Sequence, residues 1–147
     1  MTVFASIVVG TDGSETAAMA LQAAIDLAAQ CRARLHIVSA YEPVADERSR
    51  LDVPHDVQWE VGPRADVLAL LDEARGRASG GGVAEVEASA RVGDAADAIL
   101  DIAEEQRADL IVIGNKGMTG AKRFLLGSVP NKVSHHAPCS VLIVRTT

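Results

Sequence analysis

The chain has 147 residues, of which 48% are hydrophobic and 23% charged, and its net charge is −6, a balance that predicts one folded domain over residues 1–147. Its four aromatic residues are too few for a base-stacking surface and no apolar run approaches the roughly 20 residues of a membrane span, so we expect neither a nucleic-acid nor a membrane partner. Residues 110–147 hold five cations and no acid, whereas the rest holds nine Lys and Arg against 20 Asp and Glu, which favours a small anion, a nucleotide or phosphate, over DNA.

Short runs rich in Val, Ile, Leu and Ala alternate with helical patterns along the chain. The first run directly follows an N-terminus without the basic residues of a signal peptide, and Ser14 is the expected N-cap of the helix after it. Residues 42–62 contain two prolines and no steady period, which indicates a surface excursion. The expected strands span residues 4–10, 34–41, 84–92, 108–114 and 139–147. The expected helices span residues 14–31, 63–79 and 94–107, and a short one begins near Ser128.

This order of elements predicts the fold class. Strands that alternate with helices become parallel, because each return to the sheet uses a helical crossover that is almost always right-handed. We therefore expect an α/β domain with three layers, in which an open sheet has helices on both faces. In such sheets ligands bind at the carboxyl ends of the strands, where the strand order reverses.

Three expected strand ends are followed by segments that suit a ligand site: "GTDGS" after the first, "RVGDA" after the third and "GNKG" after the fourth. The last segment begins a G-x2-G-x9-G-S spacing formed by Gly114, Gly117, Gly127 and Ser128. Glycine lets backbone amides approach a phosphate closely, and the start of a helix adds a favourable dipole and a serine hydroxyl. Any one of these glycines is more often a plain turn or cap, but their combination in an acid-free segment favours an anion site.

Each charged residue near these segments has two possible roles. Lys116, Lys122 and Arg123 either add charge to the anion site or are simply solvated. Asp12 either caps a helix or faces ribose hydroxyls or a metal ion. The pattern matches neither a P-loop nor the GxGxxG dinucleotide fingerprint.

Several signals of catalysis and metal binding are missing from the sequence. It contains no HExxH, no Cys/His cluster and no GxSxG, and no base is positioned to activate Ser14 or Ser128. We therefore expect no metal site and no dedicated enzyme, with slow ATP hydrolysis or autophosphorylation at Ser128 or a nearby Thr as the alternative. Cys31 and Cys139 are isolated, which indicates reduced thiols in a cytoplasmic protein.

Three segments together resemble the universal stress protein family, in its ATP-binding branch: "IVVGTDGS", "RVGDAADAILDIAEEQRADLIVIG" and "GNKGMTGAKRFLLGSVPNKVSHHAPCSVLIV". The resemblance covers essentially the whole chain and is weakest across residues 42–62. It implies a Rossmann-like sheet of the adenine nucleotide alpha hydrolase type, with five parallel strands in the order 3-2-1-4-5. It also implies a cytoplasmic stress-response or regulatory protein that binds ATP, with Mg²⁺ possible, or cyclic AMP as some relatives do.

The resemblance also assigns positions around the nucleotide. Gly10, Thr11 and Asp12 would lie beside the ribose and adenine, and the backbone of Ala40 would meet the adenine. The residues implied around the ribose and phosphates are Gly114, Asn115, Lys116, Gly117, Gly127, Ser128 and Val129. A homodimer is implied as well, by antiparallel pairing of the last strand, 139–147. Independently, that strand is apolar and lacks proline, so an unpartnered edge there would promote aggregation.

Overall fold

The computed structural model describes residues 3–42, 65–115 and 126–146. The strands are β1 (Ser6–Gly10), β2 (Arg34–Tyr41), β3 (Val86–Val92), β4 (Leu110–Gly114) and β5 (Ser140–Val144). The helices are α1 (Glu15–Cys31), α4 (Ala65–Gly80), α5 (Ala95–Glu105) and α6 (Ser128–His136). The predicted irregular segment 42–62 lies almost entirely outside the described residues.

The five strands form one parallel sheet in the order β3-β2-β1-β4-β5. This confirms the predicted order 3-2-1-4-5 and the three-layer α/β class. The chain builds outward from β1 to β2 and β3, and then returns to the other side of β1 to add β4 and β5. The strand order therefore reverses between β1 and β4, and a ligand site is expected at their carboxyl ends.

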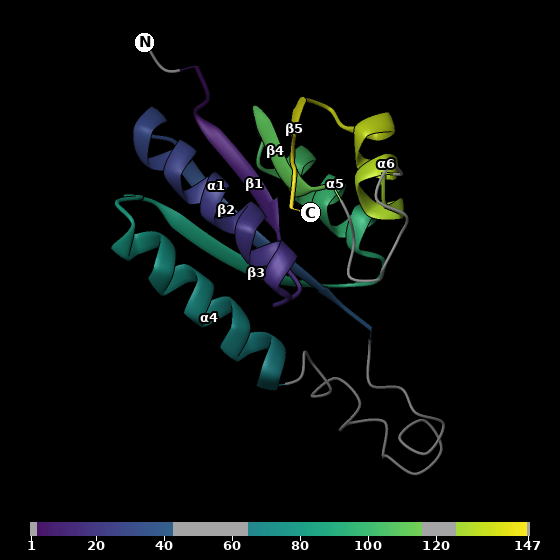
Figure 1. Ribbon diagram of the computed structural model, residues 1–147, viewed down its shortest axis with the longest axis horizontal. Coiled ribbons are helices and arrows are strands. Elements are labelled where there is room, and N and C mark those ends of the chain that lie inside the picture. Colours follow the sequence, from purple (N-terminus) through teal and green to yellow (C-terminus); the bar gives the residue numbers. More distant parts are fainter. Residues whose placement is uncertain (1–2, 43–64, 116–125, 147) are drawn as a thin grey trace.

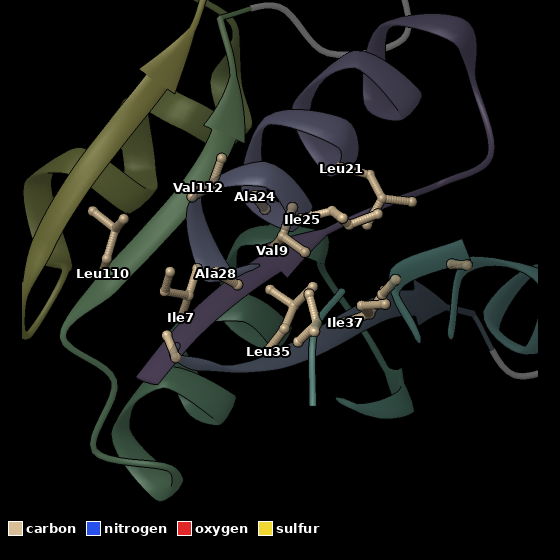
Figure 2. Close-up of a cluster of buried hydrophobic side chains, with 14 of the residues drawn as sticks. Ile7, Val9, Leu21, Ala24, Ile25, Ala28, Leu35, Ile37, Leu110 and Val112 are labelled. Atoms are coloured by element: carbon tan, nitrogen blue, oxygen red, sulfur yellow. The ribbon is translucent and has the colours of Figure 1, made fainter. Parts of the chain in front are cut away.

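Alternate residues of the central strands pack against different helices. Ile7 and Val9 of β1 belong to a buried cluster with α1 and α4, which Figure 2 shows around Ile25. Val8, between them, belongs to a second cluster with α5 and α6. Figure 1 accordingly shows α1 and α4 on one side of the sheet and α5 and α6 on the other. Each fully buried aliphatic side chain contributes roughly 1.5–3 kcal/mol to this packing.

Side chains decide where several elements begin and end. Ser14 caps α1, as predicted, by accepting a hydrogen bond from Ala17 N at 3.2 Å. The first strand begins at Ser6, two residues later than expected. Here the Asp109 carboxylate accepts hydrogen bonds from Ala5 N at 2.8 Å and Ser6 N at 3.0 Å. Among the helices in the described ranges, none combines the length and apolar character needed to cross a bilayer.

Candidate functional site

A cavity of about 130 Å³ lies at the carboxyl ends of β1, β2 and β4, at the point where the strand order reverses. Strands and the turns that follow them supply Gly10, Thr11, Asp12, Val38, Ala40, Ile113 and Gly114. The helices and the α1 cap supply Ser14, Thr16, Ala17, Ala20, Ala95, Ile99, Val129 and Pro130. The cavity is thus walled by elements from the first and last quarters of the chain, together with β2 and α5.

The turn between β1 and α1 forms one wall of the cavity. Thr11 N donates to Val38 O at 2.9 Å, which holds the turn against β2. Gly13 has φ of +86°, in the left-handed region that favours glycine, and its N–H donates to Thr11 Oγ1 at 3.3 Å. Asp12 Oδ1 accepts from Ser14 N at 2.9 Å and from Ser14 Oγ at 2.6 Å. Asp12 therefore fixes the residue that caps α1 and also lines the cavity, so both interpretations of this acid remain open.

The amino end of α6 forms the opposite wall. Gly127 is its N-cap, and no side chain from the described residues caps this end. The first intrahelical bond runs from Asn131 N to Gly127 O at 3.0 Å, so the amides of Ser128 and Val129 have no partner within the helix. Pro130 follows them and has no N–H to satisfy. Two amides without a partner among the described residues, together with the positive end of the helix dipole, suit a phosphate group.

The floor of the cavity is apolar and includes several alanines. Ala17 and Ala20 of α1 face it from one side, and Ala95 and Ile99 of α5 from the other. Gly10 leaves room for Ile99, because an ideal Cβ on Gly10 would lie 2.5 Å from Ile99 Cδ1. An apolar floor beside a few converging polar groups is typical of small-molecule sites, and here it suits the flat face of a nucleobase.

The cation of α6, Lys132, is paired with two acids and does not line the cavity. Lys132 of α6 lies 2.8 Å from Asp97 Oδ1 and 3.4 Å from Asp94 Oδ2 on α5. The hydrogen bond to Asp97, with further help from Asp94, raises the pKa of Lys132. Within the described part of the cavity wall, Asp12 is the one charged side chain. Any positive charge that a triphosphate needs would have to come from elsewhere, and Lys116, Lys122 and Arg123 lie outside the described residues.

The predicted site residues divide into four groups. The structure brings Gly10, Thr11, Asp12, Ala40, Gly114 and Val129 together around the cavity. Gly127 and Ser128 stand next to them at the start of α6. Lys116 and Gly117 lie outside the described residues. The side-chain oxygen of Asn115 accepts hydrogen bonds from Thr146 N at 2.8 Å and from Thr146 Oγ1 at 2.9 Å. All of these assignments to a nucleotide remain predictions.

Sequence reasoning missed the contribution of the helices to the cavity. Thr16, Ala17 and Ala20 lie in the first turns of α1, directly after the turn that was singled out. The sequence did contain a signal for the two alanines, because residues three positions apart, such as Ala17 and Ala20, lie on the same face of a helix. No comparable signal marked Ala95 or Ile99, whose role depends on how α5 packs across the sheet.

A polar group on the same side of the sheet as α5 lies apart from the cavity. His36 of β2 is 7% exposed, and its Nε2 lies 2.8 Å from Ser89 Oγ on β3. Its Nδ1 lies 3.4 Å from Glu87 Oε2 and has no hydrogen-bond partner among the described residues. Burial lowers the pKa of His36, although the nearby Glu87 carboxylate opposes the shift. A neutral imidazole that joins β2 to β3 explains this group without a ligand.

Comparisons with known proteins agree with this geometry. Universal stress protein Rv1636 of Mycobacterium tuberculosis is 39% identical over 147 residues, which covers all of both chains. A crystal structure of a universal stress protein in complex with cAMP is 35% identical, with a TM-score of 0.75 and 98% of each chain covered. A universal stress protein from Archaeoglobus fulgidus in complex with dAMP is 26% identical, with a TM-score of 0.65, and the match covers 96% of this chain and 98% of that one. The model of the universal stress protein family matches residues 4–145, and the chain belongs to this family.

Proposed function

We propose that this protein binds an adenine nucleotide in the cavity between β1 and β4 and acts as a stress-response or regulatory protein rather than as an enzyme. The observation that carries the proposal is the make-up of the cavity: an apolar floor lies beside the amino end of α6, which no described side chain caps. The base would lie on the floor, and the phosphate would face the amides of Ser128 and Val129. Relatives whose structures contain cAMP and dAMP support the same class of ligand.

ATP and cyclic AMP are the two candidate ligands. The G-x2-G-x9-G-S spacing favours ATP, with Mg²⁺ as a possible companion. The cAMP complex of a 35% identical protein favours cyclic AMP. The charge of the described wall also favours cyclic AMP. This wall offers two amides without a described partner and one acid, so it suits the single negative charge of a cyclic phosphate better than the several charges of a triphosphate.

Calorimetric titration and thermal melting with ATP, cyclic AMP and GTP test the proposal. A ligand at 100 times its dissociation constant stabilises the folded protein by roughly 2.7 kcal/mol. We expect that gain with at least one adenine nucleotide and a much smaller one with GTP. Binding of neither ATP nor cyclic AMP would refute the proposal.

A matched pair of variants locates the ligand. Ala17→Leu places a large side chain in the cavity and should abolish binding. Ala23→Leu lies on the same helix but does not line the cavity, so it should bind like the parent. Equal affinity of both variants would place the ligand elsewhere. Turnover of ATP above about 1 per second, within the usual range of enzymes, would instead indicate a catalyst.

We also propose that the protein is a cytoplasmic homodimer that pairs through residues 139–147. β5 is an edge strand that bonds only to β4 within the described sheet, and its Leu142 and Ile143 are 40% and 37% exposed. An exposed apolar edge is a ready surface for another strand. Leu142→Lys should therefore shift the mass measured by light scattering from dimer to monomer. Leu68→Lys, at a 52% exposed leucine of α4, is the control and should leave the mass unchanged.

A further inference from the structure

One side chain joins the end of β4 to the C-terminal segment. Asn115 Oδ1 accepts hydrogen bonds from both Thr146 N, at 2.8 Å, and Thr146 Oγ1, at 2.9 Å. Thr146 is 8% exposed, so these two donors are largely removed from water. Buried polar groups in folded proteins are nearly always paired, and Asn115 pairs both donors of Thr146. We refer to these two residues as the Asn115–Thr146 pair.

The backbone of Asn115 extends this connection to α6. Its N–H donates to Val144 O of β5 at 2.9 Å, and its carbonyl accepts from Gly127 N at 3.0 Å. Gly127 is the N-cap of α6 and precedes the amides of Ser128 and Val129, which have no partner within the described part of the chain. Asn115 therefore contacts the end of β5 with its amide and side chain and the start of α6 with its carbonyl.

We infer that the Asn115–Thr146 pair positions the amino end of α6 for anion binding, which makes Thr146 a positioning residue of the site although it does not line the cavity. The inference rests on the proposed nucleotide function. Its physical basis is that the N–H and the side chain of Asn115 are both held on the β5 side. With both held, the Cα of Asn115 stays beside the end of β5, in the position from which its carbonyl accepts from Gly127 N. Without the side-chain bonds, Asn115 is held on the β5 side by its N–H alone, so its carbonyl is less firmly placed and the amides of α6 lose their fixed direction. Preorganised donors bind an anion more tightly than mobile ones.

A direct role of Asn115 makes a different prediction. If its side-chain amide simply contacted the ligand, neither Asn115 nor Thr146 would influence the Gly127 amide of the ligand-free protein. Thr146→Val separates the two, because valine keeps the size and the backbone N–H of threonine and removes only the Oγ1 donor. Asn115→Ala removes the acceptor of both bonds, and Asn115→Asp keeps an acceptor oxygen at the same place.

Hydrogen exchange of the Gly127 amide, measured by NMR on the ligand-free protein, tests the positioning without any nucleotide. Thr146→Val should speed this exchange about fivefold, the equivalent of one neutral hydrogen bond, and Asn115→Ala should speed it more. Asn115→Asp should restore protection close to that of the parent. Ser134→Ala is the control, because it removes a hydroxyl of α6 that bonds to Asn131 O and should leave Gly127 unaffected. Unchanged exchange in both Thr146→Val and Asn115→Ala would overturn the inference.

Affinity for cyclic AMP and ATP, measured by calorimetry, tests the consequence for binding. Thr146→Val should bind severalfold more weakly than the parent. The double variant Asn115→Ala/Thr146→Val should bind no more weakly than Asn115→Ala, because the partner of Thr146 is already absent. Parent-like affinity of Thr146→Val beside a large loss in Asn115→Ala would overturn the inference and assign Asn115 a direct contact. If the parent binds neither nucleotide, the proposed function fails, and the exchange of the Gly127 amide still decides the positioning role.

Discussion

The substitution Gly10→Ala tests how tightly the site is packed against α5. An ideal Cβ on Gly10 would lie 2.5 Å from Ile99 Cδ1 and 3.1 Å from Ile99 Cγ1, whereas carbon atoms in contact normally lie about 3.5–4.0 Å apart. In Gly10→Ala the end of the Ile99 side chain must therefore move by about 1 Å. Ile99 is 4% exposed and lines the cavity, so the displaced end of its side chain can turn only toward the cavity, and the cost should lie near the lower end of the usual range. Overpacking of this kind costs about 1–3 kcal/mol, and each kcal/mol lowers Tm by about 2–4 °C in a chain of this size.

Chemical denaturation of the parent and four variants measures this cost. Ile99→Val removes Cδ1 and alone should cost about 0.5–1.5 kcal/mol. Because it also removes the atom closest to the new methyl, Gly10→Ala/Ile99→Val should be more stable than the sum of the single changes predicts. Gly76→Ala in α4 is the control: its Cβ would meet nothing within 4 Å, so it should stabilise by roughly 0.5–1 kcal/mol. Strict additivity of the two changes, or a Gly10→Ala variant as stable as the parent, would refute the steric reasoning.

Two further predictions concern stability away from the cavity. Burial lowers the pKa of His36 in the folded state from its ordinary 6.5, so below about pH 6.5 the unfolded chain binds a proton that the folded one does not. The free energy of unfolding should therefore fall as the pH drops from 7.5 to 5, and less so in His36→Gln; identical pH profiles would contradict this. Asp94 caps α5 by accepting from Asp97 N at 3.2 Å and also faces Lys132. Asp94→Ala should cost about 1 kcal/mol by urea denaturation, and Asp94→Asn much less, whereas equal losses would assign the effect to the ion pair.

The fold could be predicted from the sequence because its signals are local. The continuous apolar run at 108–114 predicted a strand, and β4 is buried over Leu110–Ile113. Alternating strands and helices then restrict the topology strongly. The resemblance to the universal stress protein family supplied the strand order, which the alternation alone did not.

The site could be predicted only where chain direction determines position. Gly10 and Gly114 end parallel strands, so they must reach the same edge of the sheet. The contribution of Ile99 depends on the packing of α5 across that edge, and no local pattern reports it. The bond between Asn115 and Thr146 joins residues 31 positions apart, a pairing that composition and spacing do not reveal.

The place of β1 in the middle of the sheet has a consequence for synthesis on the ribosome. β2 emerges soon after β1 and covers one of its edges, but β4, which covers the other, begins only at Leu110. Until then the nascent chain carries a hydrophobic strand with one row of open backbone groups, which is the kind of surface that chaperones bind. The cavity likewise lacks the wall formed by Val129 and Pro130 until α6 has left the exit tunnel.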